Sequence, residues 1–135
     1  MADKIRRVDY CYVAVPDRPG EAARVLTALR EQGVSLLSMT AFPRSAGNAQ
    51  IDLVAGKGDL EKAAAKAGLT LSPRKHAFFI TGADRPGAVA DIFRKLAEAK
   101  INVTAANAAC GQTGFGMILW VKLADVDAAA KALGI

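Results

Sequence analysis

The sequence is poor in the residues that build metal sites, disulfide frameworks and catalytic centres. Its 135 residues include two cysteines, Cys11 and Cys110, and one histidine, His76. Two cysteines cannot form a disulfide framework, and one histidine does not complete a four-ligand zinc site. Catalysis needs a nucleophile or an acid–base pair held together. We therefore expect no metal, no cofactor and no catalytic residue, and predict that the protein is not an enzyme.

Long apolar runs are also missing. No run reaches the roughly 18 residues of a membrane span, and residues 1–7 lack the apolar core of a secretion signal. These features predict a soluble cytoplasmic protein with no membrane partner.

Charge of one sign is not concentrated anywhere in the chain. Lysine and arginine number 18 against 13 acidic residues, a net charge of +5, but no like-charge block exceeds the dipeptides Arg6-Arg7 and Arg74-Lys75. A dispersed excess of this kind does not favour a nucleic-acid partner. Hydrophobic residues make up 52% of the chain, which is enough for a globular core.

An internal repeat is the most informative feature present. The sequence Asp17-Arg18-Pro19-Gly20 recurs 67 residues later as Asp84-Arg85-Pro86-Gly87. The same offset aligns apolar and glycine positions: Val25 with Ile92, Leu29 with Leu96, Gly47 with Gly114, and Ile51 with Ile118. The chain is therefore one unit of about 65 residues written twice, and we expect domains at 1–73 and 74–135.

Each copy changes its hydrophobic period in the order β-α-β-β-α. We expect strands at 10–15, 34–42 and 49–55, with their counterparts at 77–81, 101–109 and 116–122, and second helices at 59–67 and 125–133. A fourth strand at 69–72 completes the first copy. The second copy has no room for one, so either its sheet has three strands or a segment such as 4–8 is borrowed. The fold class is α+β, with two tandem ferredoxin-like βαββαβ units whose antiparallel sheets carry helices on one face.

The sheet face without helices is also apolar. Tyr10 and Tyr12 lie on one side of the first strand, and Ile118 and Trp120 on one side of a later one. Apolar patches of this kind are usually covered. We expect the other copy or a second chain to cover this face, and predict a homodimer or higher homo-oligomer.

The repeated Asp-Arg-Pro-Gly loop leads into the first helix of each copy, with proline expected in the first turn. A helix N-terminus attracts a carboxylate and its glycine permits close approach, while Asp17 or Asp84 would suit an ammonium group. Together they favour an α-amino acid ligand. The alternative is an ordinary helix start. Asn102 and Ser35, at the start of the second strands, either hydrogen-bond a ligand carboxylate or point to solvent.

These features resemble the ACT domain family over nearly the whole chain, from about Tyr10 to the end. The likeness rests on the repeated loop, the amphipathic helix after it, and the segments Gly33-Val34-Ser35-Leu36 and Lys100-Ile101-Asn102-Val103. The resemblance implies small regulatory modules that pair and bind an amino acid between two copies. The loop of one copy and the second-strand start of its neighbour would form the site. A metabolic enzyme is the kind of partner that such allosteric modules imply.

Carried over residue by residue, the resemblance implies two ligand-binding sites. The better-matched site contains Asp84, Arg85, Pro86, Gly87 and Asn102. The other contains Asp17, Arg18, Pro19, Gly20 and Ser35. Serine in place of asparagine makes the sites unequal.

An RNA-binding module of the RRM type is the alternative, because it shares the β-α-β-β-α-β order. The segment Gly114-Phe115-Gly116-Met117-Ile118-Leu119-Trp120 partly matches its aromatic RNP1 pattern. Thr113 stands where a basic residue is expected, Met117 replaces a stacking aromatic, and the first copy has no aromatic there.

Overall fold

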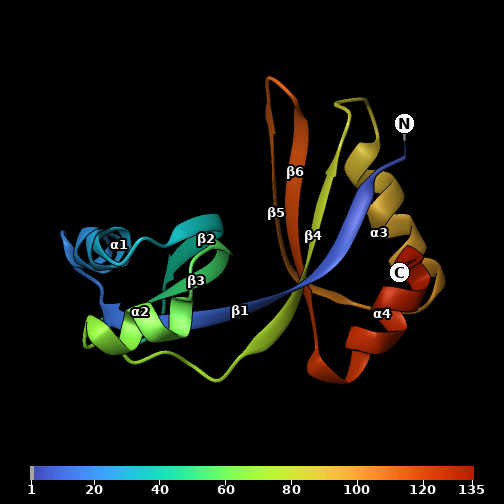
Figure 1. Cartoon of the computed structure of the whole chain (residues 1–135). Helices are drawn as coiled ribbons and strands as arrows, with labels where there is room; N and C mark the ends of the chain where they lie inside the picture. The colour runs from blue at the N-terminus through green and yellow to red at the C-terminus, as the bar shows by residue number, and fades with distance from the viewer. Residues whose placement is uncertain (1) are drawn as a thin grey trace. The chain divides into compact units, whose positions relative to one another are not determined.

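The computed structural model describes residues 2–135, whose contacts divide the chain into two compact units. The N-terminal unit is Asp9–Lys75, and the C-terminal unit joins the residues up to Val8 to His76–Ile135. The strand β1 (Lys4–Pro16) therefore contributes to both units and can be followed in blue in Figure 1.

The N-terminal unit has three strands and two helices. After β1 come α1 (Glu21–Glu31), β2 (Ser35–Pro43), β3 (Asn48–Lys57) and α2 (Leu60–Lys66). The strand order is β2-β3-β1, with both pairs antiparallel. Its core consists of alternate side chains on the strands and one face of each helix: Cys11, Val13, Val15, Val25, Leu29, Ile51, Leu53, Leu60 and Ala63.

The C-terminal unit repeats this arrangement. Its elements are β4 (Lys75–Gly82), α3 (Ala88–Glu98), β5 (Val103–Gly111), β6 (Gly114–Val121), a short 3₁₀ helix η1 (Leu123–Asp125) and α4 (Val126–Leu133). In Figure 1, α3 and α4 lie on the same side of these strands. One cluster joins Phe78 and Ile80 of β4 to Ile92 and Leu96 of α3 and Leu133 of α4. The predicted α+β fold, with helices on one face of each antiparallel sheet, is confirmed.

The missing last strand of the second copy is supplied from the start of the chain. The strand order here is β1-β4-β6-β5, so the first part of β1 takes the edge position beside β4. Ile5 packs against the core of this unit. The units differ from the contiguous segments 1–73 and 74–135 in that residues up to Val8 lie in the C-terminal unit, because their backbone pairs there.

The fourth strand expected at 69–72 is reduced to a single bridge between Val13 and Leu71. The Tyr12 N–H donates to the Ser72 hydroxyl at 2.9 Å, and the Ser72 N–H donates to the Tyr12 carbonyl at 2.8 Å. A side chain thus replaces one backbone acceptor, and Pro73 has no N–H with which to continue the ladder. The sequence pattern showed the apolar residues but not this interruption.

The face opposite the helices is buried at several strand positions. Ile118 and Trp120 are 4% and 6% exposed, and Val54 is 3% exposed. These side chains belong to neither helix-facing core cluster. The prediction that a homo-oligomer covers the apolar helix-free face stays a prediction.

A residue with left-handed backbone lies two residues after the end of the first helix in each copy. Gly33 has φ of 75°, and its counterpart Lys100 has φ of 59°. Glycine adopts this conformation without steric cost, whereas lysine does not. The turn after the first helix therefore has the same backbone conformation in both copies, but only the first copy has glycine at the left-handed position.

Within residues 2–135, no helix is long and apolar enough to cross a membrane.

Candidate functional site

The Asp-Arg-Pro-Gly loops lead into helices that start later than expected. Gly20 and Gly87 are the N-cap residues, with φ of 91° and 83°, and α1 and α3 begin one residue after them. The expectation that Pro19 and Pro86 lie in the first turn is therefore wrong. The left-handed backbone of the glycines places both prolines before the helix. Among the described residues no side chain caps either helix. The first N–H of each helix, that of Glu21 or Ala88, donates to the carbonyl of Arg18 or Arg85 at 3.5 and 3.3 Å, so a ligand would be bound by the first-turn N–H groups that follow.

Each loop borders a cavity beside the end of the second strand of its own unit. β5 and β4 both pair antiparallel with β6, so they run parallel and their carboxyl ends lie at the same edge. The cavity beside Asp84 has a volume of about 470 Å³ and the one beside Asp17 about 240 Å³. The Asp84 cavity is lined by Asp84, Arg85, Gly87, Ala88, Val89, Ala90, Ala108, Ala109, Cys110 and Phe115.

Asp84 is held in place at the edge of its cavity. The Cys110 thiol donates to the Asp84 carboxylate, with Sγ and Oδ1 3.3 Å apart. This hydrogen bond, then burial, then the negative charge of Asp84 raise the pKa of Cys110. The thiol therefore stays protonated and orients the carboxylate.

Arg85 turns toward the start of the chain. Its guanidinium donates to both carboxylate oxygens of Asp3, at 3.1 and 3.3 Å, and its Nη2 lies 3.7 Å from Asp91. The pKa of Arg85 is raised, chiefly by the hydrogen bond with Asp3. This pairing ties the residues before β1 to the loop.

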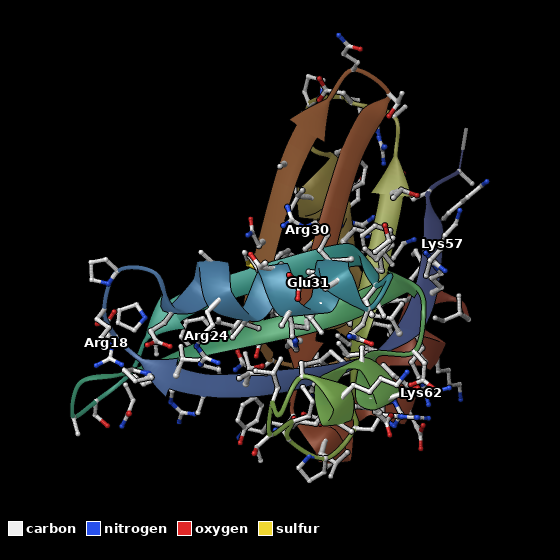
Figure 2. The ribbon with its side chains drawn as sticks, turned by 60° about the vertical axis from the view of Figure 1, so that its left-hand side comes forward. Arg18, Arg24, Arg30, Glu31, Lys57 and Lys62 are labelled. Atoms are coloured by element: carbon white, nitrogen blue, oxygen red, sulfur yellow. The ribbon has the colours of Figure 1, made fainter. Side chains whose placement is uncertain are left out.

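The Asp17 cavity contains a carboxylate of its own. Glu21, the first residue of α1, lines it and accepts from Arg18 and Arg24 at 3.0–3.1 Å. Figure 2 labels Arg18 in the loop before α1 and Arg24 along the helix. These hydrogen bonds, Arg18 first, lower the pKa of Glu21. The equivalent position in the second copy is Ala88, so the two sites differ in charge.

Asn102 and Ser35 do not lie with the loops of their own units. Asn102 precedes β5 and Cys110 lies near its end. At about 3.3 Å per residue, these positions are about 26 Å apart. Ser35 likewise starts β2, whereas Phe42, near its end, lines the Asp17 cavity. The loop and the polar residue could therefore share a site only if they came from different copies.

Cys110, Phe115 and Glu21 are site residues that the sequence interpretation missed. The parallel direction of the first two strands of each copy places the end of the second strand beside the loop, which would have indicated Cys110. The spacing of Arg18, Glu21 and Arg24 at three-residue intervals indicates ion pairs on one helix face.

Cys11 is 4% exposed in the core, and the residues from 2 to 135 contain no cluster suited to a metal ion.

The aromatic residues of the RNP1-like segment are not displayed for base stacking. Phe115 is 4% exposed and belongs to the helix-facing core, and Trp120 is 6% exposed. Stacking on RNA needs aromatic faces on an open sheet surface. These positions therefore argue against the RRM alternative.

The chain belongs to the ACT domain family. The sequence model of the ACT domain matches residues 10–67 and again 76–134, which together are most of the chain. The resemblance inferred from the repeated loop is confirmed, and with it the class of regulatory ligand-binding modules. A search of curated proteins finds no significant match.

Solved structures show the same fold at low identity. Protein BT0572 from Bacteroides thetaiotaomicron superimposes with a TM-score of 0.81 at 12% identity, over 96% of this chain and 88% of that one. The ligand-free regulatory subunit of aspartate kinase from Thermus thermophilus gives 0.65 at 18%, over 97% and 93%. Aspartokinase III of E. coli, in complex with aspartate and ADP, gives 0.58 at 16%, over 98% of this chain and 32% of that one.

Proposed function

We propose that the protein is a non-catalytic regulatory sensor that binds an α-amino acid in the Asp84 cavity. The observation that carries this proposal is that one cavity is bordered by the Asp84 carboxylate and by the uncapped start of α3 at Gly87. The carboxylate suits an ammonium group, and the helix start suits a carboxylate. The cavity therefore has a group suited to each of the two charges of a zwitterion.

The remaining wall favours an apolar ligand side chain. Beyond the loop, the cavity is bounded by Val89, Ala108, Ala109 and Phe115. Arg85, which also lines the cavity, is already paired with Asp3, so a ligand with a charged side chain would lose hydration here without gaining a free partner. We therefore expect an amino acid with a small or medium-sized uncharged side chain.

A second chain would complete the site. Asn102 is exposed and far from the Asp84 loop of its own unit, so Asn102 of a partner chain is the candidate to hydrogen-bond the ligand carboxylate. The proposal therefore includes a homodimer. Ligand binding would stabilise that assembly and signal to a metabolic enzyme of the cytoplasm, by analogy with the regulatory subunits among the structural neighbours.

The test is a thermal-shift panel of the twenty amino acids at millimolar concentration. One or a few uncharged amino acids should raise the melting temperature. Ligand at ten times its dissociation constant stabilises the folded state by about 1.4 kcal/mol. Asp84→Asn should abolish the shift, because it removes the charge that pairs with the ligand ammonium.

Asp127→Asn is the matched control. It removes one carboxylate from an exposed position of α4 in the same unit, where Asp127 contacts Arg7 at the surface, and it should leave the shift intact. A flat panel with the wild-type protein would contradict the proposed function.

A further inference from the structure

The two copies of the loop are identical over four residues and differ at the fifth. The first copy continues with Glu21 and the second with Ala88. Both positions are the first residue of a helix, directly after a left-handed glycine. The backbone at the two helix starts is therefore the same, and the two sites differ in whether the first helical residue carries a carboxylate.

Both oxygens of the Glu21 carboxylate are engaged. Arg18 Nε and Nη2 lie 3.0 Å from Oε1, and Arg24 Nε and Nη2 lie 3.1 and 3.0 Å from Oε2. The Glu21 side chain is 12% exposed, against 68% for Arg18 and 57% for Arg24. The carboxylate is thus held on both oxygens by two arginines whose own side chains are largely exposed.

The second copy cannot form this cluster. Ala88 has no carboxylate and is 6% exposed, and Asp91 stands at the position equivalent to Arg24. Arg85, the counterpart of Arg18, pairs instead with Asp3 outside the repeated segment. The start of α3 therefore has no acidic side chain on its first residue, and its cavity, at about 470 Å³, is larger than the 240 Å³ beside Asp17.

We propose that each chain has one ligand-competent cavity, beside Asp84, and that Glu21 closes the cavity beside Asp17 by acting as a built-in carboxylate. This inference rests on the proposed function and specifies which copy performs it. Glu21 supplies the negative charge that the start of α1 favours. Its carboxylate accepts from Nε and Nη2 of both arginines, so a ligand carboxylate would have to displace it to use these donors.

The experiment exchanges the two residues in the full chain. The probe is the amino acid that gives the largest shift in the twenty-member panel, and equilibrium dialysis measures the number bound per chain. The wild type should bind one. Glu21→Ala should bind two, because its first copy then matches the second at this position.

The reverse exchange should close the remaining site. Ala88→Glu should weaken binding by more than about tenfold, since it places like charge where the ligand carboxylate docks. Glu31→Ala, near the other end of α1 (Figure 2), and Ala97→Glu on the exposed side of α3 make the same charge changes and should leave the wild-type number unchanged. Circular dichroism confirms that each variant is folded.

The outcomes separate the two proposals. Two molecules bound per wild-type chain, or one bound to folded Glu21→Ala, overturns this inference alone. Absence of binding to both proteins overturns the proposed function and this inference with it. Independently of any ligand, carboxyl ¹³C titration should place the pKa of Glu21 below its ordinary range. An ordinary value would show that the arginines do not hold the carboxylate.

Discussion

The Cys110 thiol and the Asp84 carboxylate form a hydrogen bond of 3.3 Å that joins the end of β5 to the loop after β4. Because a thiol that donates to a carboxylate is stabilised in its protonated form, the pKa of Cys110 is raised. The second cysteine, Cys11, is buried, so the reactivity of thiols in the folded protein reports on Cys110.

Asp84→Asn should therefore accelerate the modification of Cys110. Removal of the negative charge lowers the thiol pKa toward its ordinary value and increases the thiolate fraction near pH 8. The rate of reaction with a disulfide reagent should rise several-fold, and Cys110→Ser should eliminate the reaction. An unchanged rate in Asp84→Asn would show that the hydrogen bond does not form in solution.

Lys100→Gly should stabilise the protein. Lys100 has a positive φ of 59°, and relief of this conformation outweighs the added freedom of glycine in the unfolded chain, for a net gain of about 0.5–1 kcal/mol. Gly33→Lys should lose a similar amount through backbone strain alone, because a Cβ at Gly33 meets nothing within 4 Å. Urea unfolding of both variants measures the difference, and the same sign for both would refute the explanation.

Asp59→Ala should destabilise the N-terminal unit by about 1 kcal/mol, the usual value of a helix cap. The Asp59 carboxylate accepts from the Lys62 N–H at 3.0 Å at the start of α2. Asp125 holds the equivalent position before α4 but makes no such bond within the described chain. Asp125→Ala should therefore cost less than about half as much, through the helix dipole alone. Equal losses in chemical unfolding would contradict the capping role.

Asp52→Asn should stabilise the protein at neutral pH. Asp52 is 7% exposed, and burial raises its pKa despite a hydrogen bond from Gln50 and the positive charges of Lys75 and Arg44. In the unfolded chain this group ionises near pH 3.9, so folding stability falls as the pH rises through that value toward the higher folded pKa.

The advantage of Asp52→Asn should accordingly disappear below about pH 3, where aspartate is protonated in both states. Urea unfolding between pH 3 and 7 tests this, with Glu31→Gln as an exposed control of equal charge change. A destabilisation of the same size at every pH would mean that Asp52 acts through its hydrogen bond and not through its charge.

The order of elements could be predicted because each copy changes its hydrophobic period where the structure changes. Val25 and Leu29 follow a helical spacing, and both are buried against strands that alternate. The interruption at Ser72 could not be predicted, because it depends on one side chain that meets Tyr12 from a distant part of the chain. The spacing of apolar residues predicts which face of a strand is buried. It does not predict which polar group hydrogen-bonds to the strand's backbone.

The sequence predicted the loop residues of the candidate site, but not the other residues that line its cavity. Asp84 and Gly87 were found by the repeat, and both line one cavity. Cys110 could not be assigned to the site from the local pattern, because its place beside Asp84 depends on the direction of the strands. The difference between the copies at Glu21 was visible in the sequence, but its significance depends on the two arginines that reach it.

The sharing of β1 between the units has a consequence for dissecting the molecule. A single cut near Pro73 cannot release two complete halves, because the edge of the C-terminal sheet would leave with the wrong fragment. An intact second half would instead need Ala2–Val8 grafted after Ile135 through a linker, which is a permuted order of the same residues. The two copies thus follow one another in the sequence, but each needs residues of the same strand, β1, to complete its sheet.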